Sequence, residues 1–149
     1  MFRFEKAALS RPLPAGYSEL RRVRFQDVDA AGIVFYPRII EYCHDAYVNF
    51  LAERGHPLDQ VLRDRKWAAP IRHAEADFFK PLRFGDTVNI GIVLAHLEPT
   101  EVALAFQLTM NDQVLAIAQS VHTFVELGPF KRIDIPEPVR SILAALPQA

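Results

Sequence analysis

The sequence predicts an α+β fold in which an antiparallel, curved sheet wraps around a long central helix, and three patterns support this. Apolar residues recur at three- and four-residue steps through residues 38–54, as on one face of a helix. Three segments with strand-like apolar patterns follow one another through residues 86–127. One further strand-like segment stands before the helix and one after it, so the order is strand, loop, helix and four strands.

The helix is the best-marked element. Pro37 suits its first turn, Gly55 suits its C-terminal cap, and Pro57 prevents its continuation. Its apolar stripe consists of Ile39, Ile40, Cys43, Ala46, Tyr47, Phe50 and Leu51. A shorter helix is expected over residues 58–66 and a closing helix over residues 137–146.

The strands are expected at residues 17–26, 72–80, 86–94, 101–110 and 114–127. In the first, alternation places Val23 and Phe25 on one face, and the second ends at Pro81. The last three read as consecutive antiparallel strands with a turn at Asn111-Asp112. Residues 1–16 are expected to form an irregular arm leading into a single domain that spans residues 1–149.

The composition limits the classes of binding partner and the cellular location that are expected. The formal net charge of −1 and the absence of a long basic run give no indication of a nucleic-acid or membrane-surface partner. The single cysteine, Cys43, cannot form an internal disulfide, so a cytoplasmic location is expected. No segment approaches the roughly 20 apolar residues of a membrane-spanning helix.

Several catalytic chemistries find no support in the motifs. None of the four serines lies in a Gly-x-Ser-x-Gly elbow, and Cys43 lies on the apolar stripe, where a small buried hydrophobe is expected. The histidines are spread along the chain without metal-ligand spacing, so no metal is expected. No glycine-rich phosphate loop is present, and no cofactor is expected.

Two carboxylates, Asp27 and Asp29, lie between the first strand and the apolar start of the helix. Aspartates in this position commonly cap helices or stabilise turns. A charge among small and apolar neighbours is also typical of a functional residue. The residues alone leave both interpretations open for Asp29, whereas Asp27, next to the strand end, is expected to be structural.

The run Asp27-Val28-Asp29-Ala30-Ala31-Gly32-Ile33-Val34-Phe35-Tyr36-Pro37 closely resembles the signature of the hotdog-fold 4-hydroxybenzoyl-CoA thioesterase family. The resemblance covers roughly residues 18–127 and includes Phe84-Gly85-Asp86 between two strands. It implies a hotdog fold and hydrolysis of an acyl-CoA, of the aryl-CoA class because Pro37 stands where the short-chain branch commonly has a histidine. It also implies that Asp29 is the catalytic carboxylate, as nucleophile or general base, and that the backbone NH near Tyr36 polarises the thioester carbonyl.

The same resemblance implies a substrate-binding set, which consists of Gly32, Phe35, Ala69, Pro70 and Ile71. It further implies a homo-oligomer, a dimer or a tetramer, with sites built from two subunits. Some relatives hold the CoA phosphates with a basic cluster where this chain has residues 95–100, which contain no Lys or Arg. The phosphate contacts must therefore come from elsewhere, or the acyl carrier differs. The alternatives left open are an acyl carrier protein thioesterase, a short-chain acyl-CoA thioesterase, a hydratase on the same fold and a non-catalytic acyl-CoA-binding protein.

Overall fold

The structure, a computed structural model, describes residues 5–149 and consists of five strands and three α-helices, with two short 3-10 turns. In chain order the elements are η1 (Lys6–Leu9), β1 (Tyr17–Arg22), η2 (Phe25–Asp27), α1 (Tyr36–Glu53), α2 (Leu58–Arg63), β2 (Ile71–Phe78), β3 (Thr87–Leu97), β4 (Glu101–Met110), β5 (Gln113–Thr123) and α3 (Glu137–Ala144).

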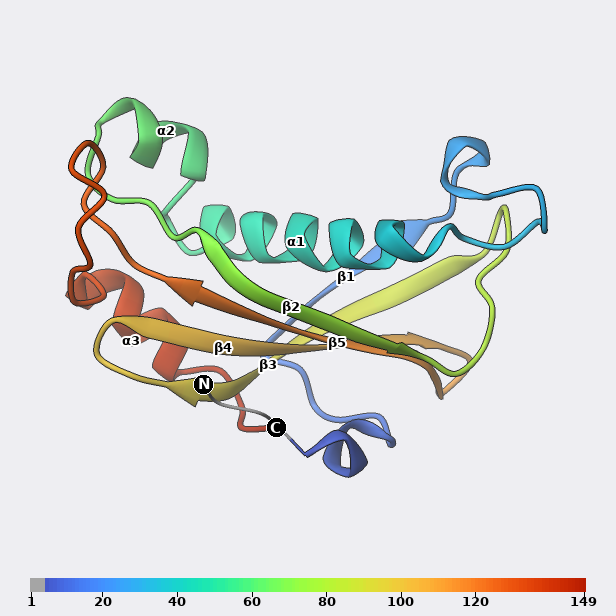
Figure 1. The fold of residues 1–149 in the computed structure, drawn as a ribbon. Coiled ribbons are helices and arrows are strands. Elements are labelled where there is room, and N and C mark those ends of the chain that lie inside the picture. Colours follow the sequence, from blue (N-terminus) through green and yellow to red (C-terminus); the bar gives the residue numbers. More distant parts are fainter. Residues whose placement is uncertain (1–4) are drawn as a thin grey trace.

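The five strands form one antiparallel sheet in the order β1-β3-β4-β5-β2, and the sheet curves around α1 (Figure 1). The expected α+β architecture is therefore confirmed. The start of α1, the loop after β1 and the turn between β2 and β3 all lie at one end of the molecule, whereas α2 and α3 lie at the other (Figure 1).

Helix α1 forms because its apolar side chains recur on the face that meets the sheet. Of the predicted stripe, all members except Ile40 are buried, and Ile40 is half-buried. Tyr42 is buried as well and was not part of the expected stripe. Phe35 precedes the helix in an extended conformation, and Gly55 follows it with a φ of 90°, as the cap prediction requires.

Strands β3, β4 and β5 follow one another through short turns, as predicted. At the turn from β4 to β5, Asn111 and Asp112 have φ values of 51° and 58°, which Asn and Asp tolerate better than most residues. The inward side chains of strands β3, β4 and β5 form the core with α1, and the outward side chains of β4 and β5 are largely buried too. This explains the nearly continuous apolar runs in these segments.

The first strand is shorter than predicted. It ends at Arg22, and the chain then forms η2, so Phe25 does not share a face with Val23. Val23 is fully buried, whereas Phe25 is 75% exposed. The cause is the buried carboxylate of Asp27, which accepts a hydrogen bond from the backbone N of Arg24 (3.0 Å) and so closes a turn where alternation alone predicts extended chain.

The N-terminal arm, expected to be irregular over residues 1–16, contains the 3-10 turn η1 within its described part. Leu9 of this turn is fully buried against Val93, Ala105 and Ile117 on the outer face of the sheet. Gln107 of β4 fixes the arm, because its side-chain amide donates to the carbonyl oxygens of Leu9 and Arg11 (2.8 and 2.7 Å). Residues 1–4 lie outside the described part.

Candidate active site

The loop that carries the aspartate pair is a small, tightly bonded hairpin. Val28 and Val34 form an antiparallel bridge, and the backbone N of Phe35 donates to the carbonyl oxygen of Asp27 (2.9 Å). At the tip, the backbone N of Asp29 donates to the carbonyl oxygen of Ile33 (3.0 Å). Asp29 and Phe35 therefore lie on opposite arms of the hairpin and are two residue pairs apart along it, which is roughly 7 Å by the rise of a strand.

Asp29 lies on the exposed side of this hairpin. Its Oδ1 accepts a hydrogen bond from the backbone N of Ala31 (2.8 Å), which is the turn-stabilising role that aspartates often have. Gly32, with a φ of 79°, completes the turn. Among the described residues, Oδ2 of Asp29 has no hydrogen-bond partner. The carboxylate is therefore held in place by one oxygen while the other is available to a ligand.

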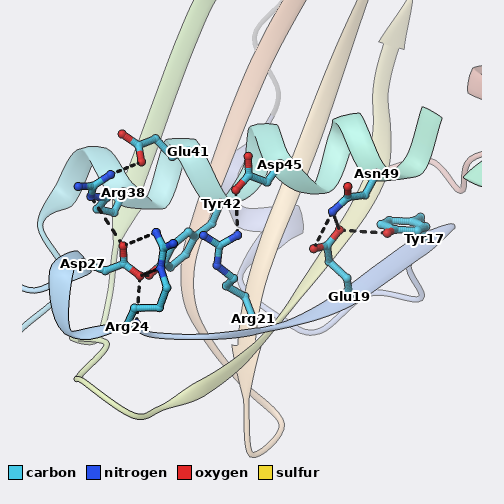
Figure 2. A network of polar contacts seen from close by, with 10 residues as sticks. All are labelled: Tyr17, Glu19, Arg21, Arg24, Asp27, Arg38, Glu41, Tyr42, Asp45 and Asn49. Carbon is cyan, nitrogen blue, oxygen red and sulfur yellow. Dashed lines mark hydrogen bonds and ion pairs between the residues drawn. The ribbon is translucent and has the colours of Figure 1, made fainter. Parts of the chain in front are cut away.

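Asp27 is fully buried and has a different environment (Figure 2). Its Oδ2 accepts hydrogen bonds from the hydroxyl of Tyr42 (2.6 Å) and the Nε of Arg24 (3.1 Å), and its Oδ1 accepts one from the Nη2 of Arg24 (3.0 Å). Burial opposes ionisation, but the hydrogen bonds from Arg24 and Tyr42 outweigh it and hold the pKa of Asp27 well below its usual range. Asp27 thus joins the loop to α1.

The first turn of α1 presents one free amide. Pro37 has no N–H, and the backbone N of Arg38 donates to the carbonyl oxygen of Phe35 (2.9 Å). The backbone N of Tyr36 has no acceptor among the described residues, whereas the backbone N of Phe35 beside it donates to the carbonyl oxygen of Asp27. Because the amides at a helix N-terminus carry partial positive charge, this N–H can bind a carbonyl oxygen.

A mostly apolar hollow of about 410 Å³ is lined in part by Tyr36, the residue that carries this amide. The ring of Tyr36 meets the ring of Phe35, with centroids 5.2 Å apart, and the ring of Phe78, with centroids 6.5 Å apart. Below, we call this cavity the apolar hollow. Its walls are Ile33, Val34, Tyr36, Ile39, Phe78, Phe79, Lys80, Pro81, Leu82 and Ala116.

The predicted substrate-binding residues fall into two groups. Gly32 and Phe35 flank the walls of the apolar hollow in sequence and lie on the hairpin beside it. Ala69, Pro70 and Ile71 lie away from it within one chain, at the start of β2. There the carbonyl oxygen of Pro70 accepts a hydrogen bond from the backbone N of Thr123 (3.0 Å).

The sequence analysis missed the wall formed by Phe78–Leu82. The run Phe78-Phe79-Lys80-Pro81 at the end of a strand was the signal, because two aromatic residues in a row at a strand end cannot both face the core. The structure leaves Phe78 and Phe79 about half-exposed. Only the fold brings this segment against the start of α1, where the backbone N of Val34 donates to the carbonyl oxygen of Leu82 (2.8 Å) and the ring of Tyr36 meets Phe78.

Other candidate groups have structural environments. Cys43 is buried, and burial raises the pKa of its thiol. His122 is also buried; burial lowers its pKa to about 4, and Ser120 lies within hydrogen-bond distance of its Nε2 (2.8 Å). Within residues 5–149, no three His, Cys, Asp or Glu side chains are grouped closely enough to hold a metal ion. In the same range, no helix has both the length and the apolar character needed to cross a membrane.

Comparison with known proteins points to one family. The sequence profile of the thioesterase-like superfamily matches residues 23–143. A 1,4-dihydroxy-2-naphthoyl-CoA hydrolase from Thermosynechococcus vestitus is 33% identical over 129 residues, which are 86% of this chain and 88% of the relative. The broader superfamily, rather than the 4-hydroxybenzoyl-CoA thioesterase family in particular, is what these similarities support.

Solved structures agree with these sequence similarities. A 1,4-dihydroxy-2-naphthoyl-CoA thioesterase from Synechocystis superposes with a TM-score of 0.81 at 25% identity, covering 87% of this chain and 96% of that one. A gentisyl-coenzyme A thioesterase superposes with a TM-score of 0.78 at 32% identity, covering 85% and 99%. Both comparisons extend over almost the whole of the other chain.

Proposed function

This chain belongs to the thioesterase-like superfamily with its hotdog fold, and we propose that it is a thioester hydrolase that cleaves an aryl-CoA to the free acid and CoA. One observation carries the choice of site: Tyr36, whose backbone N–H is free, lines the apolar hollow and directly follows the hairpin that holds Asp29. The similar proteins from Thermosynechococcus vestitus and Synechocystis are named for an aryl-CoA substrate, and the gentisyl-coenzyme A thioesterase is too.

The free amide of Tyr36 serves the carbonyl oxygen. As the thioester carbon is attacked, negative charge develops on that oxygen, and a fixed N–H donor stabilises it without reorganisation. The dipole of α1, which is 18 residues long, adds partial positive charge at the same place. The rigid hydrogen bond between Phe35 and Asp27 keeps this amide in position.

Asp29 supplies the attack. Its carboxylate either adds to the thioester carbon, giving a mixed anhydride that water then hydrolyses, or removes a proton from a water that adds to the same carbon. In both routes the carbon–sulfur bond breaks and CoA leaves as a thiolate. Because free thiols have a pKa of about 8.5, the thiolate needs little help from a general acid.

The acyl group is proposed to be aromatic because of the walls of the apolar hollow. Tyr36, Phe78 and Phe79 present ring faces and edges, which pair favourably with a flat aromatic group. Ala116 on β5 is small and leaves depth for it. Lys80 is the one basic side chain in these walls, and its Nζ donates to the Oε1 of Gln113 (2.6 Å). A short-chain acyl group is the second candidate, because an apolar wall accepts it as well.

A panel of thioesters tests the function. We expect kcat/KM for benzoyl-, hydroxybenzoyl-, phenylacetyl- and 1,4-dihydroxy-2-naphthoyl-CoA to exceed the values for straight-chain acyl-CoAs of similar size. Preference for the straight chains would transfer the proposal to the short-chain class. Tight binding of acyl-CoA without turnover of any substrate would contradict hydrolysis and favour an acyl-CoA-binding protein.

The backbone donor can be tested by replacing Tyr36 with Pro, which removes the N–H. Proline is well tolerated at the first position of a helix, and Phe35, with φ −62° and ψ 126°, already has the extended conformation that a following proline requires. We expect Tyr36→Pro to lower kcat by about 10²–10³ relative to Tyr36→Ala, since both lack the ring and only the second keeps the amide. Equal kcat values in the two variants would exclude the Tyr36 amide as the carbonyl donor.

A second copy of the chain is proposed to complete the site. Strand β2 is an edge of the sheet, and unpaired strand edges favour pairing with another chain. In a twofold antiparallel pair of β2 strands, residues Ala69–Ile71 of one copy lie beside Phe79–Pro81 of the other, which form a wall of its hollow. Light scattering should therefore give the mass of a dimer or a tetramer, and a monomer at working concentration would contradict this arrangement.

A further inference from the structure

Four exposed side chains lie on two segments of backbone that meet beside the proposed site. They are Arg22 at the end of β1, Phe25 at the start of η2, and Arg83 and Phe84 in the turn before β3. The rings of Phe25 and Phe84 meet edge to face with centroids 5.8 Å apart, although these side chains are 75% and 57% exposed. Below, we call these four residues the corner cluster. Two large aromatic rings left in solvent beside two cations call for a binding partner.

The corner cluster is held rigidly by the backbone. The turn over residues 83–86 closes when the backbone N of Asp86 donates to the carbonyl oxygen of Arg83 (3.0 Å), and the carboxylate of Asp86 accepts from the N of Arg83 (2.8 Å). Val23 pins this turn to the end of β1, because its backbone N donates to the carbonyl oxygen of Asp86 (2.8 Å). Binding to this cluster would therefore cost little conformational entropy of the backbone.

The two cations of the corner cluster are not neutralised. Neighbouring arginines are tied to carboxylates, Arg21 to Asp45 (2.8 Å) and Arg24 to Asp27 (3.0 Å) (Figure 2). Within residues 5–149, by contrast, neither Arg22 nor Arg83 has a carboxylate at ion-pair distance. The guanidinium of Arg22 lies over Gly85, with Nη2 4.0 Å from the position that a Cβ would occupy there. A larger residue at 85 would approach this guanidinium.

We infer that the corner cluster binds the nucleotide end of CoA, with the guanidinium groups of Arg22 and Arg83 on its phosphates and the Phe25–Phe84 pair against its adenine. This inference rests on the proposed function. Guanidinium groups form two-pronged, charge-assisted hydrogen bonds with phosphate oxygens. Exposed aromatic rings stack favourably on nucleotide bases, adenine included. Residues 95–100, which contain no Lys or Arg, leave the phosphate role to another part of the chain.

The distance from the amide of Tyr36 suits the pantetheine arm. Arg83 directly follows Leu82, which is part of the wall of the apolar hollow. Arg83 also forms an antiparallel bridge with Ile33, another residue of that wall. The ladder from this bridge to Tyr36 is three residues long, roughly 10 Å by strand rise. A pantetheine arm has two amide units and a backbone about as long as four residues, which spans roughly 14 Å when extended. An acyl group in the hollow therefore leaves the phosphates close to the corner cluster.

The test compares ligands with and without the nucleotide. For Arg22→Gln and Arg83→Gln we expect the Kd of CoA, measured by calorimetry, to rise about tenfold each. KM for an acyl-CoA should rise by a similar factor at unchanged kcat. Neither variant should change kcat/KM for the matching acyl-N-acetylcysteamine, which has the thioester but no nucleotide. Phe84→Leu should weaken CoA about fivefold, because a leucine cannot stack on adenine.

Arg132→Gln serves as the matched control. Arg132 is also exposed, and its backbone forms a bridge with Val125, which in turn bridges Ala68 in the segment after α2. An unchanged Kd of CoA in the corner variants would overturn the inference, and a rise in Arg132→Gln alone would place the phosphates at the opposite end. Faster turnover of an acyl carrier protein thioester than of the acyl-CoA would overturn it too. Because calorimetry needs no turnover, normal CoA binding with no hydrolysis would contradict the proposed function and leave the subsite intact.

Discussion

Replacing Asp29 with Asn is expected to lower kcat for aryl-CoA hydrolysis by about 10³, with little change in KM. The amide can neither attack the thioester carbon nor take a proton from water, and removal of such a group typically costs about 10²–10⁴ in rate. Asn retains the side-chain oxygen that accepts the hydrogen bond from the backbone N of Ala31 (2.8 Å), so the turn should persist. Initial rates over a range of substrate concentration separate kcat from KM.

The control for this variant is Asp134→Asn, which removes one carboxylate from the exposed surface of a loop before α3. Equal melting temperatures of the two variants would show that loss of activity at Asp29 is not loss of folding. Wild-type kcat in Asp29→Asn would contradict the role proposed for this residue and would return Asp29 to the turn-stabilising role that its bond to Ala31 already performs.

The long-range arrangement of the core followed from local patterns because those patterns agree with the fold. The stripe at residues 38–54 predicted α1, which runs from Tyr36 to Glu53, and alternation gave the bounds of β4 without error. The end of β1 could not be predicted in this way. It depends on the carboxylate of Asp27, whose burial requires Tyr42, a partner fifteen positions away on α1.

The residues of the proposed site also fall into those that a local motif predicts and those that only the fold brings together. Asp29 and Tyr36 belong to one contiguous motif, so its resemblance to known enzymes could locate both. The walls that face them, Phe78–Leu82 and Ala116, come from β2, its following turn and β5. Their place follows from the curvature of the sheet around α1. The two aromatic residues Phe78 and Phe79 indicate that one ring is exposed, but they do not indicate which part of the chain lies against it. The proposed role of Ala69–Ile71 depends in addition on a second copy of the chain, because within one chain these residues do not reach the apolar hollow.

Replacing Asp27 with Ala is expected to lower the free energy of unfolding by about 3 kcal/mol, the largest loss of stability expected from one residue of the loop. Loss of one member of a buried charged pair typically costs about 3–5 kcal/mol. The lower end applies here, because Arg24 is half-exposed and regains water. The buried hydroxyl of Tyr42 has no such outlet and would lose its acceptor. For a chain of this length, the melting temperature should fall by about 10 °C.

Unfolding at low pH and the variant Tyr42→Phe distinguish the contribution of the Asp27 carboxylate to stability from the contribution of its packing. Because the pKa of Asp27 is lower in the folded than in the unfolded chain, where it is near 3.8, its stabilisation is present above that pH and is lost as the pH falls below it. The difference between wild type and Asp27→Ala, measured by urea unfolding, should therefore be constant near neutral pH and shrink below about pH 4. Tyr42→Phe removes one hydrogen bond and should cost only about 1 kcal/mol. If the difference between wild type and Asp27→Ala were the same at pH 3 and pH 7, the lost stability would come from the cavity alone, and the buried carboxylate would not be what joins the loop to α1.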